Sequence, residues 1–139
     1  MKIIFTLLTV FFISTVSNSA EITLVVKNLD KSEGGYAAFG VYKSHNWLDE
    51  KNYNYSVREK VTGNTMTLKI KNVPAGKYGI AGYQDTNGNH KVDKNLVGFP
   101  KEPIGFSNGA TIGFGPPSFE DAMIEVKEGA SNTFIIELD

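Results

Sequence analysis

The stretch TMTLKIKNVPAGKYGIAGYQ, residues 65–84, decides the fold class of this chain. In residues 65–71, methionine, leucine and isoleucine alternate with threonine and lysine. Side chains of a strand point alternately to opposite faces, so this pattern predicts a strand with one buried face. The segment NVPAG, residues 72–76, predicts a turn, and residues 77–84 continue as a second strand.

The same alternation recurs on both sides of this pair, at residues 22–28, 36–42, 121–127 and 133–138. Only residues 46–60 lack it, and they are compatible with a long loop, a short helix or a ragged edge strand. Short strands separated by turn signals, without helical periodicity, predict an all-β domain. We expect an antiparallel β-sandwich of about seven strands, of immunoglobulin-like or transthyretin-like type. A small closed barrel is the alternative.

Length and charge narrow the class further. The chain has 139 residues, with 14 basic and 15 acidic side chains and no cysteine. This length suits one domain with one core. The formal net charge of -1 gives no reason to expect nucleic acid as a partner, because nucleic-acid binders carry a basic face. Without disulfides, packing must stabilise the fold, with or without a metal ion.

Residues 1–20, MKIIFTLLTVFFISTVSNSA, have the pattern of a signal peptide. The apolar run ends near Ile13 and is shorter than the ~20 apolar residues that span a bilayer, which argues against a transmembrane anchor. Cleavage after Ser19 or Ala20 would leave a single β-sandwich domain at residues 21–139, without a transmembrane segment. We therefore expect an exported protein, either periplasmic or extracellular.

Residues 85–93, DTNGNHKVD, predict a calcium-binding-like loop. Oxygen-bearing side chains recur at alternate positions, and a tight loop directs such ligands at a hard cation. The expected metal ligands are the side chains of Asp85, Asn87, Asn89 and Asp93 and the backbone carbonyl of Lys91. His90 and Leu96 replace the glycine and the closing glutamate of a full EF-hand, so calcium binding would be weak. A polar hairpin turn without an ion is the alternative.

Residues 98–119, GFPKEPIGFSNGATIGFGPPSF, follow the acidic turn closely. Five glycines and four prolines do not suit a strand core, whereas four phenylalanines argue against a disordered linker because they require burial. We therefore expect an ordered functional loop. Its candidate site residues are Glu102, Phe106, Ser107, Asn108, Phe114 and Phe119. The phenylalanines either pack under the sandwich or line a pocket or an apolar binding face.

Signals for catalysis are weak. A cysteine nucleophile is impossible, and His45 and His90 lie in hydrophilic surroundings without the pattern of a serine hydrolase or a zinc site. Glu102 and a second acidic residue such as Asp93 are compatible with glycoside hydrolysis, but such carboxylate pairs arise by chance. Trp47 with Tyr53 and Tyr55 forms either an aromatic platform for a sugar or a lid over one sandwich end. A binding protein is favoured over an enzyme.

The succession NVPAGKYGIAGYQDTNGNHKVDKNLVGFPKEPIGFSN, followed by FGPPSFEDA, closely resembles the bacterial family called domain of unknown function 2141. The family pattern consists of a P-x-G-x-Y strand start, an Asp- and Asn-rich turn, a G-x-P-x-E-P-x-G-F-S-N loop and a G-P-P-x-F-x-x-A loop exit. The matching residues here are Pro74, Gly76, Tyr78, Asp85, Asn87, Asn89, Asp93, Gly98, Pro100, Glu102, Pro103, Gly105, Phe106, Ser107, Asn108, Gly115, Pro116, Pro117, Phe119 and Ala122. The resemblance spans residues 22–138 and implies an exported bacterial sandwich protein without an assigned activity. It also implies that the acidic turn and the Phe-rich loop belong to one pattern.

Three functions follow as hypotheses. The leading one is a non-enzymatic module that binds a ligand or an envelope component, with a calcium ion in residues 85–93 positioning residues 98–119. The rival is a hydrolase of an envelope polymer that uses Glu102 or Asp93 as acid or base. The third is a purely structural envelope protein.

Overall fold

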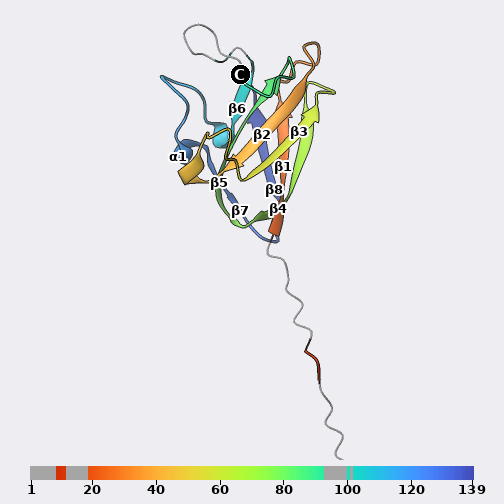
Figure 1. Cartoon of the computed structure of the whole chain (residues 1–139), viewed down its shortest axis with the longest axis vertical. Coiled ribbons are helices and arrows are strands. Elements are labelled where there is room, and N and C mark those ends of the chain that lie inside the picture. Colours follow the sequence, from red (N-terminus) through yellow and green to blue (C-terminus); the bar gives the residue numbers. More distant parts are fainter. Residues whose placement is uncertain (1–8, 12–18, 93–99, 101) are drawn as a thin grey trace, which may run out of the picture.

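The computed structural model describes residues 9–11, 19–92, 100 and 102–139 (Figure 1). In these residues the strands are β1 (Ser19–Lys27), β2 (Tyr36–Tyr42), β3 (Tyr55–Lys60), β4 (Met66–Pro74), β5 (Gly76–Asp85), β6 (Ile104–Phe106), β7 (Met123–Val126) and β8 (Asn132–Glu137). The helical turns are η1 (Ser44–Asn46), η2 (Ser107–Gly109) and α1 (Phe119–Ala122). The prediction of an all-β chain is therefore confirmed.

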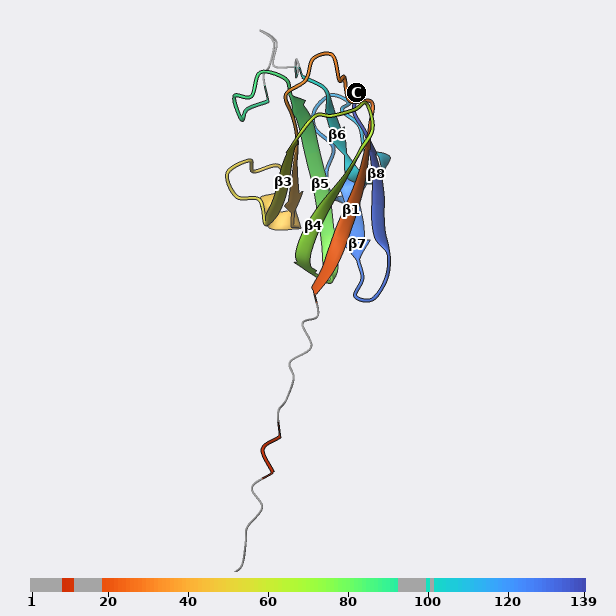
Figure 2. The same ribbon diagram turned by 90° about the vertical axis from the view of Figure 1, so that its right-hand side faces the viewer.

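The strands form two open sheets (Figures 1 and 2). In the three-stranded sheet, β1 lies between β4, which is antiparallel to it, and β8, which is parallel. In the five-stranded sheet, β2 pairs with β3 and β5, and both β6 and β7 pair with the far edge of β5. β6 therefore extends the sheet at one end of β5, and β7 extends it at the other.

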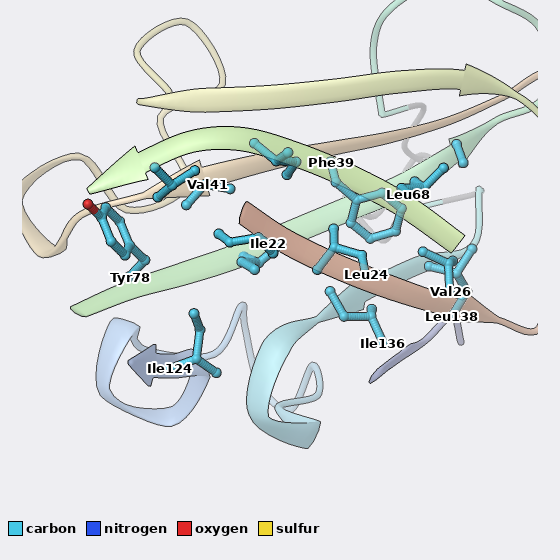
Figure 3. Packing of buried hydrophobic residues seen from close by; sticks show 14 of the residues in the cluster. Ile22, Leu24, Val26, Phe39, Val41, Leu68, Tyr78, Ile124, Ile136 and Leu138 are labelled. Atoms are coloured by element: carbon cyan, nitrogen blue, oxygen red, sulfur yellow. The ribbon is translucent and has the colours of Figure 1, made fainter. Parts of the chain in front are cut away.

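One hydrophobic core lies between the sheets, and Figure 3 shows side chains from both directed into it. The three-stranded sheet contributes Ile22, Leu24 and Ile136, none of which is exposed to solvent. From the five-stranded sheet, Phe39 and Tyr78 point into the same core. The inward faces expected from the alternation are therefore confirmed, and the alternate positions of β2 and β5 face away from the core.

The undecided segment and the Phe-rich loop have a defined structure where they are described. Residues 46–60 end in β3, an edge strand of the five-stranded sheet, after an irregular connection. The glycine- and proline-rich residues 102–119 contain the short strand β6, which the sequence did not predict, and the turn η2. Residues 93–99 and 101, with Asp93 among them, lie outside the described residues.

Most of the expected signal peptide also lies outside the described residues. β1 begins at Ser19, and Ser19 and Ala20 pair with Pro74 and Val73 of β4, so both expected cleavage positions fall at the start of this strand. The signal peptide stays a prediction. Within the described residues, no helix has the length and apolar character needed to cross a membrane.

Candidate functional site

The outer face of the five-stranded sheet has a floor of small residues. Ala37, Phe39 and Val41 of β2 point into the core, so Ala38 and Gly40 between them face outward. Gly40 pairs with Ala81 of β5 on one side and with Ser56 of β3 on the other. The Tyr42 ring covers Gly40, where an added Cβ atom would lie 2.9 Å from the Tyr42 hydroxyl. The partly exposed small residues of this face are therefore Ala38 and Ala81.

A pocket of about 490 Å³ lies over this floor. Its strand residues outside the floor include Tyr42, Arg58, Tyr83, Ile104 and Phe106. Its loop residues are Leu48, Glu50 and Tyr53 before β3, His90 and Val92 after β5, Pro100, and Ile112 and Pro116 after β6. The volume lies in the range of small-molecule sites, roughly 300–1,000 Å³. Four segments far apart in the sequence therefore frame one concave, mainly apolar site.

Trp47 fixes one end of the pocket by joining two of these segments. Its indole Nε1 donates a hydrogen bond of 2.9 Å to the carbonyl oxygen of Pro117. Its ring packs edge-on against Tyr42 at 5.7 Å and Phe119 at 5.9 Å between centroids. It also lies directly over Gly79, where a Cβ atom would approach the indole to 2.5 Å. Trp47 therefore packs on the outer face of β5 at this end of the pocket.

Tyr53 and Tyr55, the other two residues of the aromatic platform considered from the sequence, lie in different surroundings from Trp47. Tyr55 packs against Tyr78 in the core, with the ring centroids 6.2 Å apart. Tyr53 is half exposed and lines the pocket. The three residues therefore do not form one aromatic platform, and of the three only Tyr53 lines the pocket.

Two pocket tyrosines have strongly raised pKa values. Burial is the main cause of the rise in the pKa of Tyr42 to about 12, and the charge of Glu50 is the next. Burial also raises the pKa of Tyr83 to about 12, with the Asp85 carboxylate adding to the rise and Arg58 opposing it. Both phenols therefore remain protonated at neutral pH and can donate hydrogen bonds to a ligand.

The Arg58–Asp85 ion pair closes the opposite end. Asp85 is fully buried, and its Oδ2 atom lies 2.8 Å from Nη2 of Arg58. The guanidinium also stacks over the ring of Tyr36, 4.3 Å from its centroid. Burial alone would raise the pKa of Asp85, but the Arg58 hydrogen bond and the backbone amides of His90 and Asn89 hold it below its ordinary value. The positive charge of Arg58, which lines the pocket, is thus balanced by the carboxylate of Asp85.

The expected calcium ligands have other partners in the described part of the chain. The oxygens of Asp85 accept hydrogen bonds from Arg58 and from the amides of Asn89 and His90. Asn87 Oδ1 accepts from the amide of Asn89 at 3.1 Å, and Asn89 Oδ1 accepts from the amide of Lys91 at 3.0 Å. These bonds are those of a polar turn. Among the described residues, no three acidic, histidine or cysteine residues are grouped to hold a metal. Calcium stays a prediction, since Asp93 is not described.

A comparison with models of protein families identifies the family of this chain. The model described as "Uncharacterized protein conserved in bacteria (DUF2141)" matches residues 24–134. The chain belongs to the DUF2141 family. The match runs from β1 into β8 and contains all the residues of the pocket, and it confirms the resemblance found in the sequence. Curated proteins and solved structures gave no match.

Within the DUF2141 pattern, Glu102 joins the acidic turn to the Phe-rich loop. Its side chain is buried, and Oε2 accepts hydrogen bonds from the amide of Thr86 at 2.7 Å and from the Thr86 hydroxyl at 3.3 Å. The next residue, Pro103, accepts a hydrogen bond from the amide of Gln84 through its carbonyl oxygen. These contacts join the acidic turn directly to the start of the Phe-rich loop in this chain.

Ser107 and Asn108 of the pattern fasten η2 to its neighbours. The buried Ser107 hydroxyl accepts a hydrogen bond from the amide of Ile80 at 2.8 Å and donates one to the carbonyl oxygen of Ala122. Asn108, with φ of 57°, donates through Nδ2 to the carbonyl oxygen of Asp121 at 3.0 Å. Both side chains therefore stabilise the loop that carries one wall of the pocket.

The phenylalanines of the DUF2141 loop divide into three environments. Phe106 is buried and lines the pocket, as one of the sequence alternatives expected. Phe119 is half-buried against Trp47. Phe114 is fully exposed at the tip of its loop, so it does not pack under the sandwich. Phe99 lies outside the described residues.

Proposed function

We propose that this DUF2141 protein is a non-enzymatic binding module that takes a small organic ligand into the pocket on the outer face of the five-stranded sheet. The observation that carries the proposal is the pocket itself, with the small residues Ala38 and Ala81 in its floor. Strands that face water on one side ordinarily carry polar residues there. Small residues under an apolar concavity are typical of a site that accommodates a ligand.

The acidic residues favour binding over hydrolysis. The hydrolase hypothesis uses Glu102 or Asp93. Oε2 of Glu102 accepts hydrogen bonds from Thr86, and Asp93 lies outside the described residues. Carboxylates engaged in this way stabilise the fold and are poorly placed to exchange protons with a substrate. The two histidines, His45 and His90, are exposed.

The cellular setting and the finer details of the fold belong to the same proposal. The signal-like residues 1–20 support export to the periplasm or beyond the cell, where the pocket would meet an envelope component or a solute. The stacked sheets, with the terminal strands β1 and β8 paired, support a sandwich of immunoglobulin-like or transthyretin-like type. A calcium ion at residues 85–93 would stiffen the wall that carries His90 and Val92.

Filling the floor tests the proposal. Ala81→Leu places a larger side chain where the ligand would lie, so we expect it to abolish binding while the strand is kept. Thr67→Leu on the exposed outer face of β4 is the matched control, because it adds bulk outside the pocket. Binding is followed by chemical-shift changes of pocket amides in a titration with a soluble fragment library. The proposal fails if no fragment moves these resonances, or if Ala81→Leu binds as the native protein does.

A further inference from the structure

We infer that the pocket is selective for an organic cation, an alkylammonium or quaternary ammonium group, and this inference rests on the proposed function. The first support is the aromatic lining. Tyr42, Tyr53, Tyr83 and Phe106 line the pocket around the small floor. Aromatic faces attract a cation through the ring quadrupole, by about 0.5–2 kcal/mol per contact.

The second support is the charge around the pocket. Glu50 lines it, whereas Arg58, its one described cationic side chain, is already paired with the buried Asp85. The guanidinium is occupied further by its stacking on Tyr36. Glu50 and Asp85 together outweigh Arg58 by one negative charge, and this excess attracts cations and repels anions.

The tyrosines respond to the same negative field. After burial, the charges of Glu50 and Asp49 are the next causes of the raised pKa of Tyr42. Glu102 and Glu50 contribute in the same direction at Tyr83. Carboxylates thus act on both tyrosines from separate segments of the chain, so negative charge reaches the pocket from more than one side.

The size of the pocket excludes a bare metal ion as its specific occupant. A volume of about 490 Å³ with apolar walls such as Leu48, Ile104 and Ile112 suits a group that combines charge with hydrocarbon surface. Alkylammonium groups do so, because their charge is spread over apolar carbon atoms that desolvate easily. The small side chain of Ala81 lets such a group approach the sheet closely.

A set of three nearly isosteric probes tests the inference by calorimetry and by NMR titration at low salt. The probes are choline, its uncharged analogue with carbon in place of the ammonium nitrogen, and the tert-butylacetate anion. We expect choline to bind about tenfold more tightly than its uncharged analogue, and the anion to bind most weakly.

Variants then assign the selectivity to named residues. Glu50→Gln should weaken choline binding about three- to tenfold and leave the uncharged analogue unchanged. The exposed Glu125 of β7 supplies the matched control, since Glu125→Gln makes the same charge change outside the pocket lining and should alter neither. Tyr53→Leu, at a half-exposed position where the fold tolerates the change, should also weaken choline selectively.

The outcomes separate the two proposals. If the uncharged analogue or the anion binds as tightly as choline, or if Glu50→Gln changes nothing, cation selectivity is overturned while a ligand pocket stands. If the fragment library binds but none of the three probes does, the same conclusion holds. If neither the library nor the probes move pocket resonances, the proposed function itself fails.

Discussion

Arg58 and Asp85 form an ion pair with 2.8 Å between Nη2 and Oδ2. The side chain of Asp85 is fully buried, whereas about a quarter of the Arg58 side chain is exposed. This asymmetry predicts a large effect when the partner of Asp85 is removed. Arg58→Met should destabilise the fold by roughly 2–4 kcal/mol, because a buried carboxylate loses its counter-charge. Urea denaturation measures the change.

The exposed pair Lys69–Glu21, with 3.6 Å between Nζ and Oε1, supplies the comparison. Lys69→Met should cost less than about 1 kcal/mol, because water screens a surface ion pair. If the two variants lose equal stability, burial of Asp85 does not decide the strength of the pair.

Asp85 also predicts how stability depends on pH. Its pKa in the folded protein lies below the ordinary value of 3.8, so the folded state binds the proton less readily than the unfolded chain does. The stabilisation is therefore present above the unfolded pKa and is lost as the pH falls through the folded pKa.

Melting curves between about pH 7 and about pH 3 test this dependence. Asp85→Asn should be less stable at neutral pH and should lose less further stability on acidification than the native protein. If the melting temperatures of the two proteins fall in parallel as the pH is lowered, another carboxyl group controls the loss of stability in acid.

Gly79 predicts how tightly Trp47 is seated. A Cβ atom at this position would lie 2.5 Å from the indole, so Gly79→Ala forces the ring away from the sheet. We expect a loss of about 1–3 kcal/mol and a shift in the emission of Trp47, the single tryptophan of the chain. Gly113→Ala is the control, because no atom lies within 4 Å of the added Cβ there. Equal behaviour of the two variants would argue against close packing of Trp47 on β5.

The sequence predicted the strands that bury one full face. In residues 36–42 the alternation of Phe39 and Val41 with smaller residues reflects the burial of one side, and β2 has these bounds. The sequence does not decide β3, because this edge strand buries Tyr55, Val57 and the adjacent Arg58 only in part and leaves Glu59 exposed, which obscures the alternation. Edge strands carry a weaker periodicity because less of their surface is packed.

The pocket was not predicted, because strand register creates it. Ala38 and Gly40 alternate with Phe39 and Val41 in the sequence, but small residues in a strand also occur where nothing binds. Strand pairing places Gly40 of β2 beside Ala81 of β5. The tertiary fold then brings Glu50 and Ile112, from two distant loops, into the lining of the same pocket. Contacts between distant segments leave no spacing in the sequence that a local pattern can detect.

The calcium hypothesis gives the last prediction, and the structure sharpens its design. If the oxygens of Asp85, Asn87, Asn89, Lys91 and Asp93 hold the ion, millimolar calcium should raise the melting temperature and EDTA should reverse the rise. Asp93→Asn is the informative variant, because Asp85 also pairs with Arg58 and its loss would destabilise the fold without calcium. Under the hypothesis, Asp93→Asn removes the calcium-dependent rise and leaves the melting temperature in EDTA nearly unchanged. A polar turn without an ion predicts no calcium shift in either protein, since the amides of Asn89 and Lys91 already satisfy the turn oxygens.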